Sequence, residues 1–371
     1  MIVYFFVAFL AIIIQFVPVK SNKQYLRRTI CSFIPLFLYM ALRKDFGFDE
    51  YAYHYFFDNV HKASNIFNVN SHMEPGYAVL NKIMPTYQSL IIFTSFLTLC
   101  AYSFLIYRFV PRNYSWLAVL ILFMSPSLTI FFMISGIRNG ISASLLILSC
   151  YYLEKRKLKP YIIIGIIAVT IHTSALFMFP VCYLLGTNKP LSKRTLTIGM
   201  VVMVVMSFIS LSILADNILP IISYVTGKYD EQVMELAEVA DNRGVIGALV
   251  GIILGAGLIY YLWKNNKNRI IPKNKKQLSS MPIMECDTFK YKFALLYAAA
   301  FTLGALGGRI SQYLIYYFII AVVGIMAHEK DTVFKFGYLL IVLYLSYSTM
   351  KGWMTSDYFH YDVYKSVFGD F

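Results

Sequence analysis

Long apolar runs alternate with short polar segments along the chain. A helix needs about 20 predominantly apolar residues to cross the roughly 30 Å of hydrocarbon in a membrane. We interpret as spanning helices the runs at residues 2–19, 26–42, 87–107, 115–134, 137–153, 195–215, 244–263, 289–307, 310–327 and 332–350. No basic stretch precedes the first run and no small-residue cleavage site follows it, so we expect it to persist as a helix. The pattern predicts an all-α, polytopic membrane helical bundle that forms a single integral membrane domain over residues 1–371.

The segments between these runs differ in charge, and the difference orients the predicted helices. Loops rich in Lys and Arg tend to stay in the cytoplasm. Such loops occur at residues 20–28, 108–112, 155–159, 189–194 and 264–276. The outer loop at 43–86, the acidic loop at 216–243 and the tail from Lys351 are predicted to face outward. Both termini then face outward, and a basic cytoplasmic linker at 264–288 separates two helical groups.

Residues 160–186 lie between two basic loops that should both be cytoplasmic, so this segment must cross twice or dip and return. We predict a short broken pair of helices that meet near His172, with Thr173 and Ser174 available to cap the second helix. The pair brings the total to about 12 transmembrane segments. His172 would face a polar chamber, because irregular backbone at membrane depth lines a cavity or is buried in protein. The alternative is one tilted helix with a packed histidine.

Composition supports the membrane class and excludes others. Hydrophobic residues make up 58% of the chain, charged residues make up 14%, and the mean hydropathy is +0.62, which is too apolar for a soluble globule. The net charge of +14 resides in the loop clusters that set topology, so we expect no nucleic-acid partner. The five cysteines have neither disulfide nor metal spacing, and we expect no metal and no cofactor.

The outer loop carries the first candidates for chemistry. Asp49 and Tyr53 are four residues apart and share a face if they are helical. Glu74 precedes Pro75, which suits a first helical turn, so its carboxylate is held just ahead of an amphipathic segment on the membrane surface. The simpler interpretations are a solvated acid at Asp49 and a helix-capping acid at Glu74.

Several short motifs occur together in a fixed order. They are Arg43-x-x-Phe46-Gly47-x-Asp49-x-x-x-Tyr53, Glu74-Pro75-Gly76-Tyr77, Ile137-Arg138, and Ile171-His172-Thr173-Ser174-Ala175-Leu176 with Pro180 downstream. The order and spacing resemble the EpsG-type branch of the Wzy polysaccharide polymerases over roughly residues 38–185. Arg309 and its neighbouring tyrosines resemble the family pattern less closely. Asn139 departs from many relatives, in which glutamine is frequent.

The resemblance implies a membrane glycosyltransferase at the outer face of the bacterial inner membrane. It would join repeat units carried on undecaprenyl diphosphate into capsule, exopolysaccharide or O-antigen. Its partners would be the undecaprenyl-diphosphate-linked oligosaccharide, membrane lipid and a chain-length regulator protein. The alternatives are a flippase for lipid-linked oligosaccharide and a ligase or acyltransferase. A flippase would need symmetric sites and internal repeats, which the sequence does not show.

Glycosyl transfer requires groups that hold the leaving diphosphate and a base that takes the acceptor proton. Guanidinium groups suit the first task, and Arg138 and Arg309 are candidates, with Arg43 as a third. A histidine or carboxylate suits the second task, and the candidates His172, Asp49 and Glu74 stay open. Aromatic side chains that could contact sugar or phosphate are Tyr53, Tyr77 and Tyr313.

The charge pattern predicts a topology that labelling can check. In intact cells, single cysteines near positions 230 and 360 should react with a membrane-impermeant maleimide, because both segments face outward. A cysteine near position 270 should react only after permeabilisation. Labelling near 270 from outside would contradict the predicted orientation.

Overall fold

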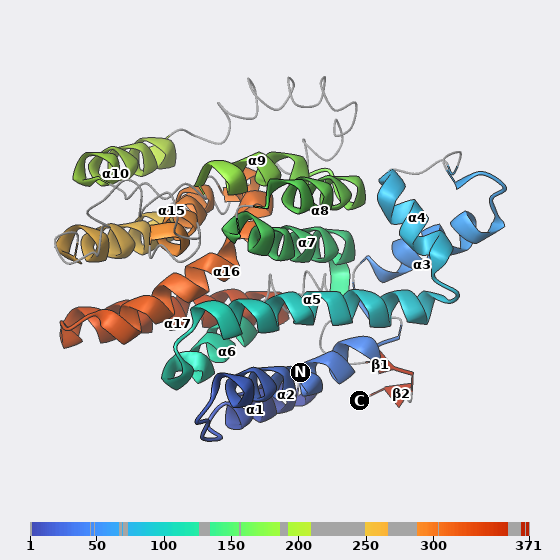
Figure 1. Ribbon diagram of the computed structural model, residues 1–371, viewed down its shortest axis with the longest axis horizontal. Helices are drawn as coiled ribbons and strands as arrows, with labels where there is room; N and C mark the ends of the chain where they lie inside the picture. The colour runs from blue at the N-terminus through green and yellow to red at the C-terminus, as the bar shows by residue number, and fades with distance from the viewer. Residues whose placement is uncertain are drawn as a thin grey trace. The chain divides into compact units, whose positions relative to one another are not determined.

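The computed structural model describes residues 2–44, 46–47, 49–66, 69, 73–125, 134–155, 157–185, 192–208, 249–265, 288–302, 304–354, 365–367 and 369–370. These residues are helical apart from turns and one antiparallel pair of short strands, β1 (Lys365–Ser366) and β2 (Gly369–Asp370) (Figure 1). The chain divides into two compact units, Met1–Leu184 with Val322–Phe371, and Leu185–Ala321. For the described residues, the predicted helical class is confirmed.

The first unit contains most of the labelled helices. They are α1 (Ile2–Ile14), α2 (Asn22–Ala41), α3 (Glu50–Lys62), α4 (Pro75–Ile83), α5 (Tyr87–Phe109), the 3₁₀ turn η2 (Arg112–Tyr114), α6 (Ser115–Phe123), α7 (Ile137–Glu154), α8 (Leu158–Ile171), α9 (Ala175–Leu185) and α17 (Thr332–Met354). The second unit contains α10 (Lys193–Phe208), the helix Leu249–Lys264, α15 (Thr288–Thr302) and the first part of α16 (Gly304–His328).

Two described helices are long and apolar enough to cross a membrane, Tyr87–Phe109 and Ser311–His328. Shorter apolar helices lie at Ile2–Ile14, Leu158–Ile171, Ala175–Leu185, Leu249–Lys264 and Thr332–Ser348. The predicted total of about 12 spans stays a prediction. The acidic loop at 216–243 lies outside the described residues, as does most of the basic linker.

Several helix boundaries differ from the sequence prediction, and one of them changes the place of a candidate residue. The sequence places a break between the apolar runs 289–307 and 310–327, whereas α15 ends at Thr302 and α16 begins at Gly304. Gly307 and Gly308, which were predicted to permit close approach of backbones, lie inside α16. Arg309 therefore lies in the second turn of a helix and not at its end.

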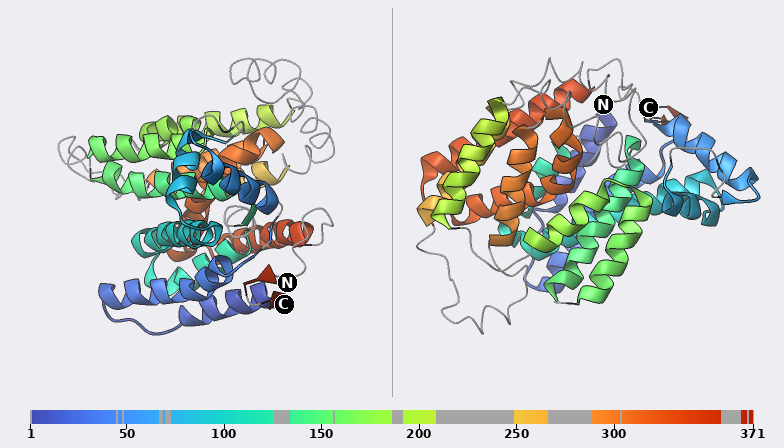
Figure 2. Two further views of the ribbon diagram at one scale, coloured as in Figure 1. Left: turned by 90° about the vertical axis from the view of Figure 1, so that its right-hand side faces the viewer. Right: turned by 90° about the horizontal axis from the view of Figure 1, so that it is seen from above.

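The described part of residues 43–86, which is predicted to face outward and is called the outer segment below, packs on the other helices of the first unit through an aromatic and aliphatic cluster. The phenyl ring of Phe56 in α3 stacks on that of Tyr77 in α4, with ring centroids 5.8 Å apart. The buried members of the cluster are Tyr53, Phe56, Phe57, Val60, Tyr77, Ala78, Leu90, Ile137, Ile141 and Ile171. They come from α3, α4, α5, α7 and α8, so burial of this cluster joins the outer segment to the bundle. Helices α3 and α4 lie together at the end where α7 begins (Figures 1 and 2).

Helices α8 and α9 form the predicted broken pair. They run antiparallel, because Tyr161 near the start of α8 lies 6.4 Å from Tyr183 near the end of α9, while Gly165 further along α8 approaches Phe179 nearer the start of α9. The Tyr161 hydroxyl also donates to the Phe179 carbonyl at 2.5 Å. Gly165 allows this approach, since a Cβ there would lie 2.2 Å from the Phe179 ring. Helix α7 packs along α8, and the Ser142 hydroxyl donates to the Ala168 carbonyl at 2.9 Å.

Gly76 sets the distance between α4 and the end of α8. A Cβ at this position would lie 2.3 Å from Oγ1 of Thr170 and 2.8 Å from its carbonyl carbon. Glycine is therefore required for the two backbones to approach this closely. The contact brings Glu74, which precedes α4, next to His172, which follows α8.

The C-terminal strand pair contacts the beginning of the outer segment. The Val367 amide donates to the Leu42 carbonyl at 2.9 Å, and Ser366 forms an antiparallel bridge with Arg43. The two segments therefore lie on the same side of the first unit. This agrees with the shared orientation that the charge pattern predicts for them.

Replacing Gly76 with alanine should force α4 away from α8, because the new Cβ meets backbone atoms that cannot rotate aside. We expect a loss of about 1–3 kcal/mol in the free energy of unfolding, measured by thermal unfolding of the detergent-purified protein. Gly337→Ala is the matched control, since nothing lies within 4 Å of its added Cβ and alanine favours a helix. Equal stability of the two variants would contradict the packing argument.

Candidate functional site

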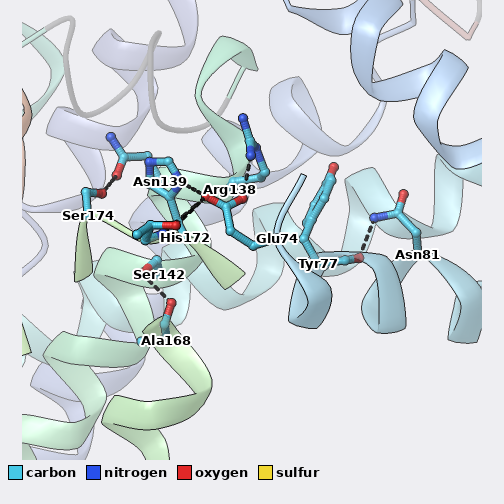
Figure 3. A network of polar contacts seen from close by, with 10 residues as sticks. Glu74, Tyr77, Asn81, Arg138, Asn139, Ser142, Ala168, His172 and Ser174 are labelled. Carbon is cyan, nitrogen blue, oxygen red and sulfur yellow. Dashed lines mark hydrogen bonds and ion pairs between the residues drawn. The ribbon is translucent and has the colours of Figure 1, made fainter. Parts of the chain in front are cut away.

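The carboxylate of Glu74 is the centre of a polar cluster in the first unit (Figure 3). Its Oε2 accepts a hydrogen bond and ion pair from Nη1 of Arg138. Its Oε1 lies 3.0 Å from Nδ1 of His172 and accepts hydrogen bonds from Thr173, 3.2 Å from the amide and 3.1 Å from the hydroxyl. One carboxylate thus connects the start of α4, the start of α7 and the break between α8 and α9.

The local backbone turns Glu74 away from its own helix. Glu74 is the N-cap of α4 in an extended conformation, and its side chain makes no capping hydrogen bond. Pro75 occupies the first turn of α4, where its missing amide hydrogen costs nothing. The interpretation of Glu74 as a helix-capping acid is therefore wrong for its side chain, which reaches other helices instead.

His172 lies at the break that the charge pattern predicts. Its backbone is extended, with φ −153° and ψ 123°, between the end of α8 and the turn that leads into α9. The ring is mostly buried, with 13% of the side chain exposed. An ionised carboxylate accepts but cannot donate, so its contact with Glu74 fixes the proton on Nδ1 and leaves Nε2 as the basic nitrogen.

Arg138 is the second residue of α7. A cation at a helix N-terminus is disfavoured by the helix dipole, and the ion pair with Glu74 offsets this cost. The guanidinium also lies over the Tyr53 ring, 5.8 Å from its centroid. Its Nε is buried and has no hydrogen-bond partner among the residues that the structure describes.

Two carboxyl groups of the outer segment, those of Glu74 and Asp49, have opposite electrostatic environments. Burial raises the pKa of Glu74, but His172, Arg138 and the Thr173 amide outweigh it and hold that pKa well below its usual range. Burial raises the pKa of Asp49, and Arg138 offsets only part of the effect. Burial also raises the pKa of Tyr53 to about 12. Glu74 is thus the ionised partner, and Asp49 is the more basic carboxyl.

Asp49 and Tyr53 are held at the first turn of α3. Asp49 is the N-cap of this helix, makes no side-chain capping bond, and accepts the Tyr53 amide at its carbonyl, 3.0 Å away. Tyr53 is buried and meets Tyr77 edge to face at 5.8 Å. Both residues therefore lie on the side of the cluster that Arg138 occupies, since the charge of Arg138 lowers the pKa of each.

Arg43 lies deeper than the sequence suggests. Its side chain is fully buried, Nη1 donates to the Met40 carbonyl at 3.0 Å, and Nε lies 3.8 Å from Glu50. Tyr77 is also fully buried and packs inside the aromatic cluster. These contacts describe residues that support the end of α2 and the outer helices. A direct role for either in substrate binding stays a prediction.

The remaining two candidates belong to α16 in the second unit. Tyr313 is buried, with 4% of its surface exposed. Arg309 lies in the same helix, and its side chain is outside what the structure describes. Their role in the site stays a prediction.

Sequence reasoning missed several hydrogen-bonding residues of the cluster. The Ser174 hydroxyl donates to Oδ1 of Asn139 at 3.2 Å, and the Thr173 hydroxyl donates to Glu74. These two residues were expected to cap α9, and their hydroxyls instead join the break to α7 and α4. A sequence signal for such contacts was present, because the polar residues Arg138, Asn139 and Ser142 stand close together at the start of an otherwise apolar run.

The described residues form a predominantly helical protein with apolar helices, in which the segment before α4, α7 and the α8–α9 pair share one Glu–His–Arg cluster. The chain belongs to the EpsG family, whose family model matches residues 26–366. The resemblance of its motifs to that family is confirmed, and membership is consistent with a polysaccharide polymerase-like protein. No curated protein and no solved structure matches the chain. In the described ranges, no group of three or more His, Cys, Asp or Glu is placed to hold a metal ion.

Replacing Glu74 with glutamine should destabilise the protein in a pH-dependent manner. At neutral pH the variant loses a mostly buried ion pair, and we expect a loss of about 3 kcal/mol in the free energy of unfolding. Because the folded-state pKa of Glu74 is lowered, its contribution is complete above the ordinary value of 4.5 and is lost as the pH falls through the folded-state pKa. Thermal unfolding in detergent from pH 7 to pH 3 should show the difference from wild type shrinking.

The control is Asp58→Asn, because Asp58 is an exposed acid on α3. We expect this variant to stay within about 0.5 kcal/mol of wild type at neutral pH. A Glu74→Gln difference that is absent at pH 7, or unchanged at low pH, would contradict the proposed ion pair.

Proposed function

We propose that the protein is a polysaccharide polymerase that transfers glycan from an undecaprenyl diphosphate carrier to a lipid-linked repeat unit at the outer face of the bacterial inner membrane. The observation that carries the proposal is the Glu74 carboxylate, which holds an arginine and a histidine within one cluster. Membership of the EpsG family supports the class of reaction. The C-terminal contact with Leu42 supports a shared side for the two segments, and their outward orientation is proposed from the charge pattern.

Arg138 is the proposed ligand of the leaving diphosphate. Negative charge develops on the diphosphate as the bond to the anomeric carbon breaks, and a preplaced guanidinium stabilises it. Glu74 holds Arg138 on one side, and 21% of the Arg138 side chain stays exposed for a ligand. A positively charged side chain fixed before substrate arrives needs little reorganisation during the reaction. A role for Arg309 in phosphate binding stays a prediction from its sequence context.

His172 is the proposed general base. The acceptor hydroxyl oxygen attacks the anomeric carbon, its proton passes to Nε2 of His172, and the bond to the diphosphate breaks with the electron pair on the lipid carrier. Glu74 accepts four hydrogen bonds and has a lowered pKa, so it is a weak base. Its role is to fix the His172 tautomer and stabilise the imidazolium, as carboxylates do for histidine in other enzymes.

Asp49 is the alternative base. Its carboxyl is half-buried and has a raised pKa, both of which favour proton acceptance. It faces the same arginine as Glu74 does. The choice between His172 and Asp49 as the base must come from variants that keep the shape of each side chain.

Elongation of a purified lipid-linked repeat unit by the detergent-purified protein should separate these roles. His172→Gln should lower the rate by about 100-fold to 10,000-fold, since glutamine cannot accept the proton. Arg138→Ala should lower it by about 100-fold or more, and Arg138→Lys should retain part of the activity because it keeps charge without the planar fork. Substrate binding, measured separately by filter retention, should survive in His172→Gln.

Two exposed residues supply matched controls, His61→Gln on α3 and Arg27→Ala on α2. Both should elongate at wild-type rates. A dead Asp49→Asn protein that still binds substrate, together with an active His172→Gln protein, would transfer the base role to Asp49. Wild-type elongation by Arg138→Ala at equal protein level would remove Arg138 from the site.

A further inference from the structure

Two tyrosines project from the exposed face of α3. Tyr51 and Tyr55 are 83% and 62% exposed. They are one helical turn apart, their rings are nearly parallel at 12°, and their centroids are 6.5 Å apart. The pair presents a double aromatic surface to the surroundings.

The neighbours of this pair distinguish it from a surface that faces lipid. The exposed stripe continues along α3 with Asp58 and Lys62, which are charged. By contrast, the exposed residues of α8 after its first turn are all isoleucine, namely Ile162, Ile163, Ile166 and Ile167 at 44–58% exposure. Aromatic rings beside charged groups suit a ligand that has apolar C–H faces and many hydroxyl groups. Sugars have both features.

The pair is also continuous with the Glu74 cluster. Helix α3 begins at Asp49, and Tyr53 of the same helix lies beneath the guanidinium of Arg138. The rise of an α-helix is about 1.5 Å per residue, so Tyr51 and Tyr55 are within about 9 Å of Asp49 along the axis. In the first two turns of α3, one face therefore carries Tyr53 beside the proposed reaction centre, and another face carries Tyr51 and Tyr55.

We propose that Tyr51 and Tyr55 form a binding subsite for the glycan chain, by stacking of sugar rings on the two aromatic faces. The C–H groups of a pyranose face carry partial positive charge and meet the negative π face of a tyrosine ring. Asp58 and Lys62 supply hydrogen bonds to the hydroxyl groups of the following sugar. The subsite rests on the proposed polymerase function, and it would hold the growing chain between successive additions. Loss of the subsite should shorten the polymer without abolishing transfer.

The test uses the full-length protein and the polysaccharide isolated from cells that express it, cleaved to short oligosaccharides as the probe. Binding in detergent is measured by saturation-transfer difference NMR, and polymer length is measured by gel electrophoresis. The Tyr51→Ala/Tyr55→Ala variant should bind the oligosaccharide about tenfold more weakly and make shorter polymer. A single addition to a lipid-linked repeat unit should proceed at the wild-type rate.

Two variants make the result specific. Tyr51→Phe/Tyr55→Phe keeps both rings and should bind and elongate as wild type does. Tyr344→Ala/Tyr347→Ala removes two exposed tyrosines of α17 and should leave oligosaccharide binding unchanged.

Three results would overturn the subsite: unchanged binding and polymer length in the double alanine variant, equal defects in the alanine and phenylalanine variants, or a defect confined to membrane retention. The last result would assign the pair to the lipid interface. Failure of the proposed function is seen separately, as a wild-type protein that makes no single addition while the oligosaccharide still binds.

Discussion

The arrangement of the first unit depends on one anion placed between three chain breaks. Arg138 lies in the first turn of α7, and His172 lies between α8 and α9. The Glu74 carboxylate hydrogen-bonds to both side chains, because Glu74 immediately precedes α4 where α4 contacts the end of α8. Polar backbone and side chains at such breaks are costly when unpaired, so the carboxylate lowers the free energy of an otherwise unfavourable junction. The missing side chain of Gly76 is what allows the junction to close.

The sequence predicts the elements of this junction better than their contacts. Two basic loops that flank residues 160–186 require a return of the chain, and the α8–α9 break at His172 follows from that charge rule. The partner of the histidine is 98 positions away in the sequence, so neither periodicity nor charge could identify Glu74 as its hydrogen-bond acceptor. Arg43 illustrates a second limit, because the sequence did not indicate that its side chain is buried. Its place in a motif suggested contact with substrate, whereas tertiary packing buries it against Met40 and Glu50.

Environment, and not residue type, separates the two acidic groups that the outer segment contributes. Glu74 receives hydrogen bonds from three residues and stays ionised, while Asp49 is desolvated with weaker compensation. Pairs of titratable groups that are shifted in opposite directions are typical of sites where one group must hold charge and another must exchange a proton. A sequence shows that both acids are present, but their division of tasks depends on which helix ends each one meets.

The first unit is assembled from residues 1–184 and 322–371, which has a consequence for biosynthesis. At translation rates of about 5–20 residues per second, the ribosome needs roughly 7–27 s to make the intervening stretch, residues 185–321. During that interval the early helices are already made, while α17 and Val367, whose amide binds the Leu42 carbonyl, do not yet exist. A nascent chain stalled in this window would present an unfinished edge at the end of α2, where a membrane quality-control protease could distinguish it from the completed protein.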